Sequence, residues 1–251
     1  MNNLTSTRIV RDDIRKRFNV INNHVNSETQ FFHMASEFLK YVKDNELLSR
    51  LLQEIISDKC YLSEIAAQSY RHVNHFSKIV LINEADPTRC RLTLHIWKPP
   101  FSDKEKAQEL IHDHRFSFAS YIVCGKQEHQ IFSEVEKESI TKKIFQKYKY
   151  YPSKTGNIHD CYFDKDVQLN EKNNMIVNKG DIYTMENVTI HRIMFPIEEK
   201  PIISFLVRGP RKRIFTHTYN TFYPREGTSS NVPMYTTDEL DELLKYTLNQ
   251  I

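Results

Sequence analysis

The sequence predicts a mainly β protein with helices: an antiparallel barrel or sandwich, preceded by a helical region and followed by one more helix. Up to His75, apolar residues recur at the three- and four-residue spacing of helix faces. After His75, short runs of β-branched and aromatic residues follow one another without helical stretches between them. That second pattern favours antiparallel strands over a parallel sheet with helical crossovers.

The helices are expected within residues 28 to 75, packed outside the barrel. Ser27 followed by Gln30 has the pattern of a capping box, which marks a helix start. Thr236 and Glu239 repeat that pattern before a final helix near 237 to 249. The apolar stripes are Phe31, Phe32, Ala35, Phe38, Leu39 and Val42; Leu47, Leu48, Leu51, Leu52, Ile55 and Ile56; Leu62, Ile65, Ala66, Ser69 and Val73; and Leu240, Leu243, Leu244 and Leu248.

The strands are expected between residue 79 and about residue 215. Asp86 and Pro87 mark a turn between the first two. The candidate ranges are 79–83, 91–97, 116–124, 127–133, 158–163, 181–185, 190–195 and 201–208. Three regions result: a helical region at 1–78, a barrel at 79–225, and a C-terminal loop and helix at 226–251.

Composition restricts the classes of function. The 251 residues are 39% hydrophobic and 27% charged, which indicates a globular chain, and the net charge of +3 is too small for a dedicated nucleic-acid binder. Lysines and tyrosines alternate over residues 134 to 156, a pattern that can grip single-stranded nucleic acid. Interspersed acidic residues make a solvated hairpin arm the better interpretation. We therefore expect no nucleic-acid partner.

Location follows from similar reasoning. The sequence has no apolar run of membrane-spanning length and no signal-peptide pattern at its start. Its four cysteines are scattered, without a CxxC pair, which is typical of reduced thiols. We expect a cytoplasmic protein without a membrane partner.

Histidines supply the candidate chemistry. His112 and His114 are two residues apart, so on a strand both imidazoles point to one face and can bind one metal ion. Other histidines need no such role, because a lone histidine is usually a surface or hydrogen-bonded core residue.

The sequence around these histidines resembles the cupin superfamily. Its first motif, G-x5-H-x-H-x3-4-E-x6-G, matches at His112, His114 and Gly125, and its second, G-x5-P-x-G-x2-H-x3-N, matches at Gly180 and His191. The resemblance covers about residues 79 to 210 and implies an antiparallel jelly-roll barrel with a metal held by His112, His114 and His191. The glutamate of the first motif falls on Phe118, or on the next residue with the longer spacing. The implied site therefore has three histidines and no carboxylate.

Within that superfamily the chain looks most like the cysteine dioxygenase-like thiol dioxygenases. Shared segments are L-T-L-H-I-W at 92–97, I-H-D-H at 111–114, I-H-R-I at 190–193 and P-I-I-S-F-L-V-R-G-P at 201–210. The family's Ser-His-Tyr positions here read Ser204, Leu206 and Arg208. Only the serine is kept, so the resemblance implies the metal site but not free cysteine as the substrate.

Several residues are candidates for binding and catalysis. Arg208 and Arg91 have guanidinium groups that can hold a substrate carboxylate through two hydrogen bonds, although either alone is as well explained by a surface ion pair. Glu128 and His129 are candidates for a fourth ligand or a partner of one. Arg115 is expected to point away from the metal. Tyr183 and His95 are, with Arg208, the candidates for catalysis, and Ser204, Trp97 and Phe118 are further candidates for substrate binding. Strand phase alone leaves open whether His95 and Trp97 or the alternate residues face the barrel interior.

The leading functional hypothesis is a mononuclear non-haem Fe(II) oxygenase that uses O2 on a small amino-acid-like or carboxylate-bearing substrate. Imidazole also suits other divalent metals, so a cupin isomerase or lyase that works without O2 is a second hypothesis. A non-catalytic ligand-binding cupin is a third. Cupins often pair through exposed strands, so a homodimer is among the expected states.

Overall fold

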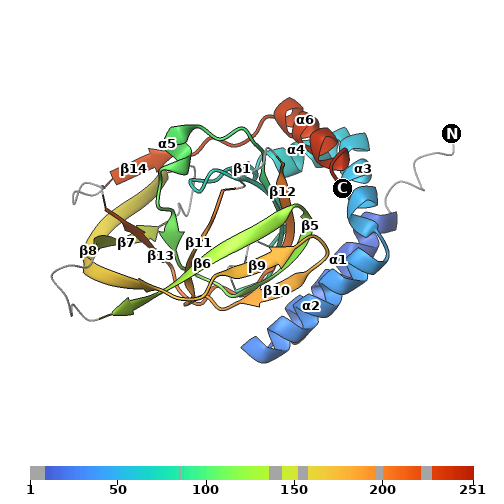
Figure 1. Cartoon of the computed structure of the whole chain (residues 1–251). Coiled ribbons are helices and arrows are strands. Elements are labelled where there is room, and N and C mark those ends of the chain that lie inside the picture. The colour runs from blue at the N-terminus through green and yellow to red at the C-terminus, as the bar shows by residue number, and fades with distance from the viewer. Residues whose placement is uncertain are drawn as a thin grey trace, which may run out of the picture.

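The computed structural model describes residues 9–84, 86, 88–135, 143–151, 158–195, 200–221 and 228–251. Helices lie near both ends of the chain and strands fill its middle (Figure 1). The helices are α1 (Ile9–His24), α2 (Glu28–Asp44), α3 (Leu47–Ser57), α4 (Lys59–Ala66), α5 (Asp103–Lys106) and α6 (Thr237–Leu248). None of the helices in these ranges is long and apolar enough to cross a membrane.

The strands form two antiparallel sheets. One contains β1 (Tyr70–Arg71), β2 (Ser77–Asn83), β3 (Arg91–Trp97), β12 (Ile202–Arg208), β5 (Phe118–Cys124) and β10 (Ile182–Met185), in that order. The other contains β14 (Thr228–Asn231), β8 (Ile158–Glu171), β7 (Ile144–Tyr151), β13 (Thr216–Asn220), β4 (Ile111–His112), β11 (Ile190–Ile193), β6 (Lys126–Val135) and β9 (Met175–Asn178). A further pairing joins β8 to β6. The expected fold class, mainly β with antiparallel strands and helices at both ends, is confirmed, and it is consistent with the cupin fold.

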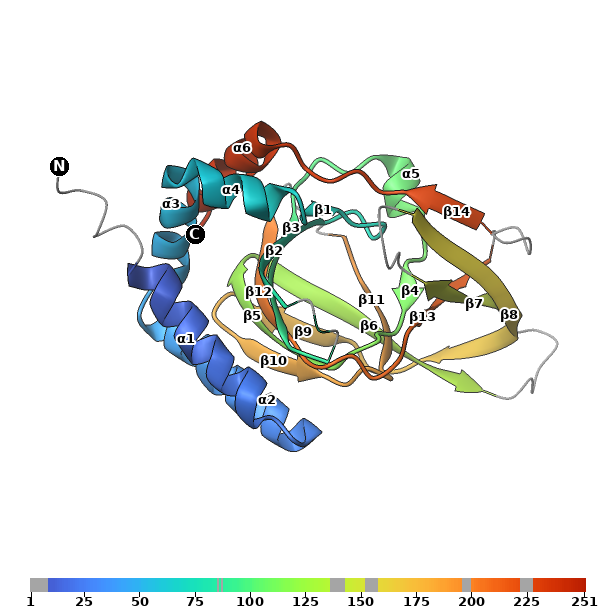
Figure 2. The ribbon, with the colours of Figure 1, turned by 180° about the vertical axis from the view of Figure 1, so that it is seen from behind.

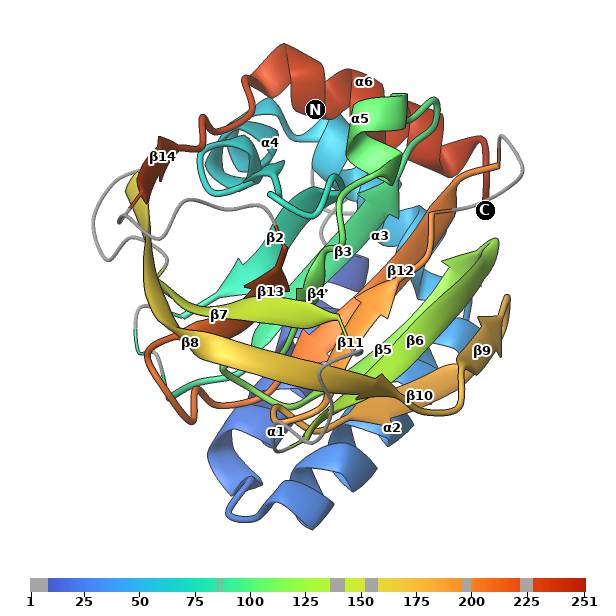
Figure 3. The ribbon, with the colours of Figure 1, turned by 60° about the vertical axis from the view of Figure 1, so that its left-hand side comes forward.

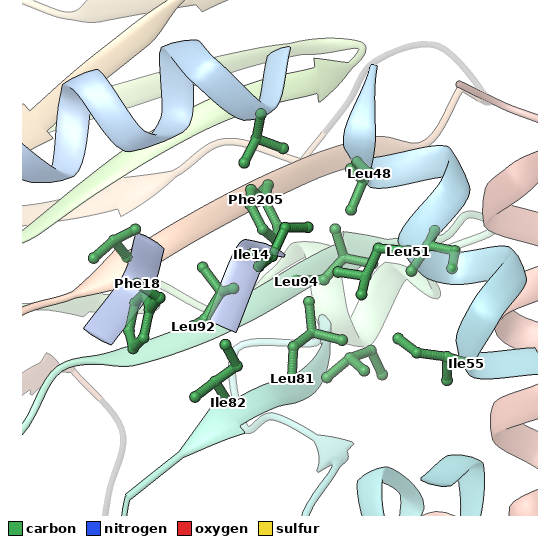
Figure 4. Packing of buried hydrophobic residues seen from close by; sticks show 14 of the residues in the cluster. Ile14, Phe18, Leu48, Leu51, Ile55, Leu81, Ile82, Leu92, Leu94 and Phe205 are labelled. Carbon is green, nitrogen blue, oxygen red and sulfur yellow. The ribbon is translucent and has the colours of Figure 1, made fainter. Parts of the chain in front are cut away.

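The two sheets face each other, and helices α1 to α4, together with α6, lie on the outer side of the first sheet (Figures 2 and 3). Strand alternation explains this arrangement, since successive side chains of a strand point to opposite faces. Leu92, Leu94 and Phe205 point outward into the helical layer, where they meet Ile14 and Leu51 (Figure 4). The other face of β3 and β12 is therefore left for the space between the sheets.

Capping hydrogen bonds set the helix starts that the sequence predicted. The Ser27 hydroxyl accepts a hydrogen bond from the Gln30 backbone N–H at 3.2 Å. At α6, the Thr236 hydroxyl accepts from the Glu239 N–H at 3.2 Å while the Glu239 carboxylate accepts from the Thr236 N–H at 2.8 Å, which completes a capping box.

Some parts of the sequence interpretation need correction, and others fall outside the described residues. The third predicted helix corresponds to α4. It ends at Ala66 instead of reaching Val73, because β1 at Tyr70–Arg71 pairs with β2. The segment interpreted as a solvated arm contains β7, which lies between β8 and β13. Helix α1 lies within the helical region expected at 1–78, but before residue 28, where the first individual helix was expected. Pro87 and the 136–142 and 152–157 parts of the expected arm lie outside the described residues.

Candidate metal centre

Strand pairing brings the three histidines together. His112 on β4 is the direct cross-strand partner of His191 on β11, so both side chains point to the same face. His114 lies just beyond β4, and its backbone N–H donates to the Asn187 carbonyl at 2.9 Å. Residues almost eighty positions apart in the chain thus meet at one point between the sheets.

The geometry of this cluster fits a divalent transition metal. One ring nitrogen from each of His112, His114 and His191 lies within 4.8 Å of the others. The Nε2 atoms of His114 and His191 are 2.8 Å apart. Imidazole nitrogens bind such ions at about 2.0–2.1 Å, so a bound ion needs only a small separation of the rings. The group contains no Cys, Asp or Glu among the described residues, and Phe118 stacks edge-on against His114 with ring centroids 5.0 Å apart.

Burial keeps these imidazoles in the form that a metal requires. It lowers the pKa of His112, and it lowers the pKa of His114 and His191 well below the usual value, with neighbouring histidines adding to the shift of the latter two. A histidine binds metal as the neutral ring. Each imidazole of the cluster is therefore neutral at neutral pH and has one unprotonated ring nitrogen that can bind a metal.

A second layer of hydrogen bonds orients two of the rings. His112 Nδ1 donates to the Leu110 carbonyl at 2.8 Å, which leaves its Nε2 for the cluster. His191 Nδ1 lies 3.0 Å from His129 Nδ1. His129 is fully buried and its ring stacks on that of His191. Of the two candidates near Gly125, His129 is thus the partner of a ligand, while Glu128 accepts a hydrogen bond from Asn174 at 3.2 Å.

Asp113 anchors the strand between the first two ligands. It is 3% exposed. Its carboxylate forms an ion pair with Arg213 and accepts hydrogen bonds from the His217 backbone N–H at 2.6 Å and from His217 Nδ1 at 2.7 Å. These bonds tie the I-H-D-H segment to β13 and so fix the direction in which His112 and His114 point.

The histidines open onto a cavity of about 500 Å³ between the two sheets. This volume is within the usual range for small-molecule sites. His95, Trp97, Phe118, Tyr183 and Ser204, all predicted as site residues, line it together with the three histidines. The structure thus decides the phase of β3: the face with His95 and Trp97 looks inward.

Not every candidate reaches the cavity surface. Arg91 and Arg208 are absent from the described lining residues and lie behind the wall, at the far end of β3 and β12. Arg208 is 3% exposed and donates to the Arg89 carbonyl at 2.8 Å. Arg115 lines the cavity, contrary to the expectation that it points away, because β4 ends at His112 and strand alternation no longer applies beyond it.

Sequence reasoning missed two lining residues that bear on the site. Gln127 is fully buried, its Oε1 accepts from the Tyr183 hydroxyl at 3.0 Å, and its Nε2 has no partner among the described residues. Lys78 lines the cavity although it is only 8% exposed. The one available signal for Lys78 was a charged residue directly before the apolar run I-V-L-I of β2.

No protein-family model matches the chain, and no curated protein sequence matches it. Among solved structures, the chain is similar to a conserved double-stranded β-helix protein from Klebsiella pneumoniae, with 12% identity, a TM-score of 0.31, and coverage of 62% of this chain and 95% of that one. It is also similar to Drosophila melanogaster CENP-C bound to CAL1, with 10% identity, a TM-score of 0.31, and coverage of 66% and 99%. Likenesses this distant assign neither a family nor a function.

Proposed function

We propose that this protein is a mononuclear non-haem Fe(II)-dependent oxygenase that uses O2 to oxidise a small carboxylate-bearing substrate. The observation that carries the proposal is the convergence of His112, His114 and His191 on one wall of a substrate-sized cavity. When bound there, Fe(II) would supply open coordination positions and redox chemistry with O2.

Several features of the site suit an anionic substrate. Phe118, which holds the sequence position of the glutamate in the cupin motif, packs against His114. Three neutral imidazoles bring no negative charge, so the substrate is the natural source of it. The Gln127 Nε2, which has no partner among the described residues, can donate a hydrogen bond to a substrate oxygen, while the Tyr183 hydroxyl orients that amide.

Two further cavity residues each keep a single protonation state at neutral pH. Burial raises the pKa of Tyr183, so its hydroxyl stays protonated at neutral pH and serves as a donor. Burial, with a smaller effect from Lys78, lowers the pKa of His95 well below its usual value, so this imidazole stays neutral. His95 Nε2 lies 3.2 Å from the Thr93 hydroxyl, and its ring stacks against Phe76. We assign His95, Trp97 and Ser204 to the substrate-contacting wall.

The first test is the metal content of the purified full-length chain. The wild-type protein should retain about one equivalent of metal, and His114→Ala should lose most of it, because two imidazoles hold an ion much less well than three. His24→Ala is the matched control, since His24 is exposed on α1. Equal metal loss in both variants would refute the assignment.

The second test separates the oxygenase from its alternatives. The metal-free protein is reloaded anaerobically with Fe(II), Zn(II) or Mn(II), and O2 consumption is then followed with a panel of amino acids and small carboxylates. The proposal predicts O2 uptake only with Fe(II) and a substrate. Turnover with Zn(II) or Mn(II) and no O2 uptake would instead indicate an isomerase or lyase, and binding without turnover a ligand-binding protein.

A further inference from the structure

Five basic residues gather beside the cavity: three lie on strands of the first sheet, one follows His114 and one follows β12. We call them the cationic wall: Lys78, Arg91, Arg115, Arg208 and Arg211. Arg91 on β3 is the direct cross-strand partner of Arg208 on β12, so two guanidinium groups share one face of adjacent strands. Like charges placed directly opposite each other destabilise a sheet. Lys78 is on the neighbouring strand β2, opposite His95.

Two of these cations are buried and the other three are partly buried, and within the described residues none has a counter-charge. Lys78 is 8% exposed and Arg208 is 3% exposed. None of the five forms an ion pair with a carboxylate in the described part of the chain, and the Nε atoms of Arg91, Arg208 and Arg211 have no hydrogen-bond partner there. The Arg208 guanidinium instead lies over the Phe116 ring at 5.1 Å.

The charges act on one another. Burial lowers the pKa of Lys78 well below its usual value, and Arg91, Arg115, Arg208 and Arg211 lower it further. Burial and the neighbouring guanidinium groups also lower the pKa of Arg208 and Arg115. Buried charges of one sign are costly unless an opposite charge accompanies them.

Part of the cationic wall lines the same cavity as the histidines. Lys78 and Arg115 both line it, and so do Tyr70, Tyr150 and His159 from the same region. Arg91 and Arg208 lie behind this surface. An anion in the cavity would therefore contact an ammonium, a guanidinium and aromatic hydroxyl groups, with further positive charge behind them.

We propose that the cationic wall binds a phosphoryl group of the substrate. This inference rests on the proposed function and names the substrate class: a phosphorylated small molecule whose other end reaches the three histidines. A phosphoryl group carries about −1.5 to −2 charges and three strong acceptor oxygens at neutral pH. A phosphoryl group brings about twice the negative charge of a single carboxylate and three acceptor oxygens, so it compensates more of the five cations than a carboxylate does.

The test uses metal-free full-length protein, so that its outcome is independent of the metal site. Isothermal titration calorimetry at matched ionic strength compares inorganic phosphate and pyrophosphate with succinate and acetate. We expect saturable binding of phosphate and pyrophosphate, at least tenfold tighter than that of either carboxylate. Equally tight binding of succinate would overturn the phosphoryl assignment, and no binding of any anion would overturn the site.

Variants locate the binding. Lys78→Met removes one charge at nearly constant volume, and Arg115→Gln removes a second cavity-lining charge; each should weaken phosphate binding at least tenfold. Lys78→Met should also raise the melting temperature of the metal-free protein, because it relieves like-charge repulsion. Lys126→Met is the control, since Lys126 is exposed on β6. Unchanged phosphate affinity in both cavity variants would refute the proposal, while normal metal content in them would leave the proposed metal centre intact.

Discussion

Asp113 is the residue on which the direction of the histidine ligands most depends. It stands between His112 and His114, and all its bonds go to β13 and to the loop that precedes it. The ligand side chains themselves make few bonds that would hold the I-H-D-H segment in place. The buried Asp113 carboxylate holds the segment in place through its bonds to Arg213 and His217.

Asp113→Asn should lower the free energy of unfolding by about 3 kcal/mol, because it leaves the Arg213 guanidinium partly buried without its counter-charge. Urea unfolding of the metal-free chain measures this change. Asp12→Asn is the matched control, since Asp12 is 70% exposed and lies 4.0 Å from its arginine. Its effect should stay below about 0.5 kcal/mol. A small effect at both positions would show that Asp113 does not anchor the site.

Residue patterns in the sequence predicted which histidines meet, but not what surrounds them. His112, His114 and His191 stand at fixed spacings within two motifs, and spacing is visible in a sequence. The positions of His129, Gln127 and Lys78 depend on which face of β6 and β2 looks inward, and that depends on pairing with strands distant in the chain. Periodicity gives the two faces of a strand without telling which one is the inner face.

At the scale of elements, turns between strands decide whether the site forms. Gly125 joins β5 to β6 with φ at +78°, and Gly180 joins β9 to β10 with φ at +95°. Both are glycines that the resemblance to cupins singled out. They differ in one respect: a Cβ on Gly125 would lie 2.5 Å from the Pro201 carbonyl oxygen, whereas one on Gly180 would meet nothing within 4 Å.

This difference predicts unequal effects of the same substitution. Gly180→Ala should cost about 1 kcal/mol, the strain of a positive φ in a residue with a side chain. Gly125→Ala should cost clearly more, about 3 kcal/mol, because the close contact with backbone adds to that strain. Chemical denaturation of the two variants side by side measures the gap. Equal costs would mean that β12 shifts away from this turn without resistance.

Element types were predicted well where periodicity was regular, and poorly where pairing overrode it. The range 91–97 coincides with β3, and the final helix at Thr237–Leu248 was expected near 237–249. The charged segment around β7 looked solvated because acidic residues are interspersed among its lysines and aromatic residues. Tyr148 in it is 1% exposed, because β8 and β13 pair on both sides of β7 and its inner face is covered.

At the scale of the whole molecule, the two faces of the six-stranded sheet have different roles: the outer face packs in the hydrophobic core, and the inner face lines the cavity. Its outer face carries Leu92, Leu94 and Phe205 into the helical core, and its inner face carries Lys78, His95 and Ser204 to the cavity. The sequence predicted both layers, but the buried cations of the inner face could not be assigned to a cavity before the two sheets were seen to face each other.

Neutral histidines that line the cavity predict a loss of stability in mild acid. Burial lowers the pKa of His72 and His95 well below the usual value; Lys78 adds to both shifts, and His112, His95 and His159 add to that of His72. His72 Nδ1 also accepts a hydrogen bond from the Asn74 N–H at 3.2 Å, which requires an unprotonated nitrogen. When the pH falls below about 6.5, the unfolded chain binds protons at these histidines and the folded chain does not.

The stabilisation by these two groups is therefore complete above about pH 6.5 and is lost as the pH falls towards their folded-state pKa. Together they should account for about 2 kcal/mol of the loss between pH 6.5 and 5.5. Urea unfolding of the metal-free chain at both pH values measures the loss within each variant. The double variant His72→Gln/His95→Gln should lose about 2 kcal/mol less than the wild type over this interval, while His24→Gln, changed at an exposed site, should match the wild type. An equal pH dependence in all three proteins would show that the inner face is hydrated enough to accept protons without unfolding.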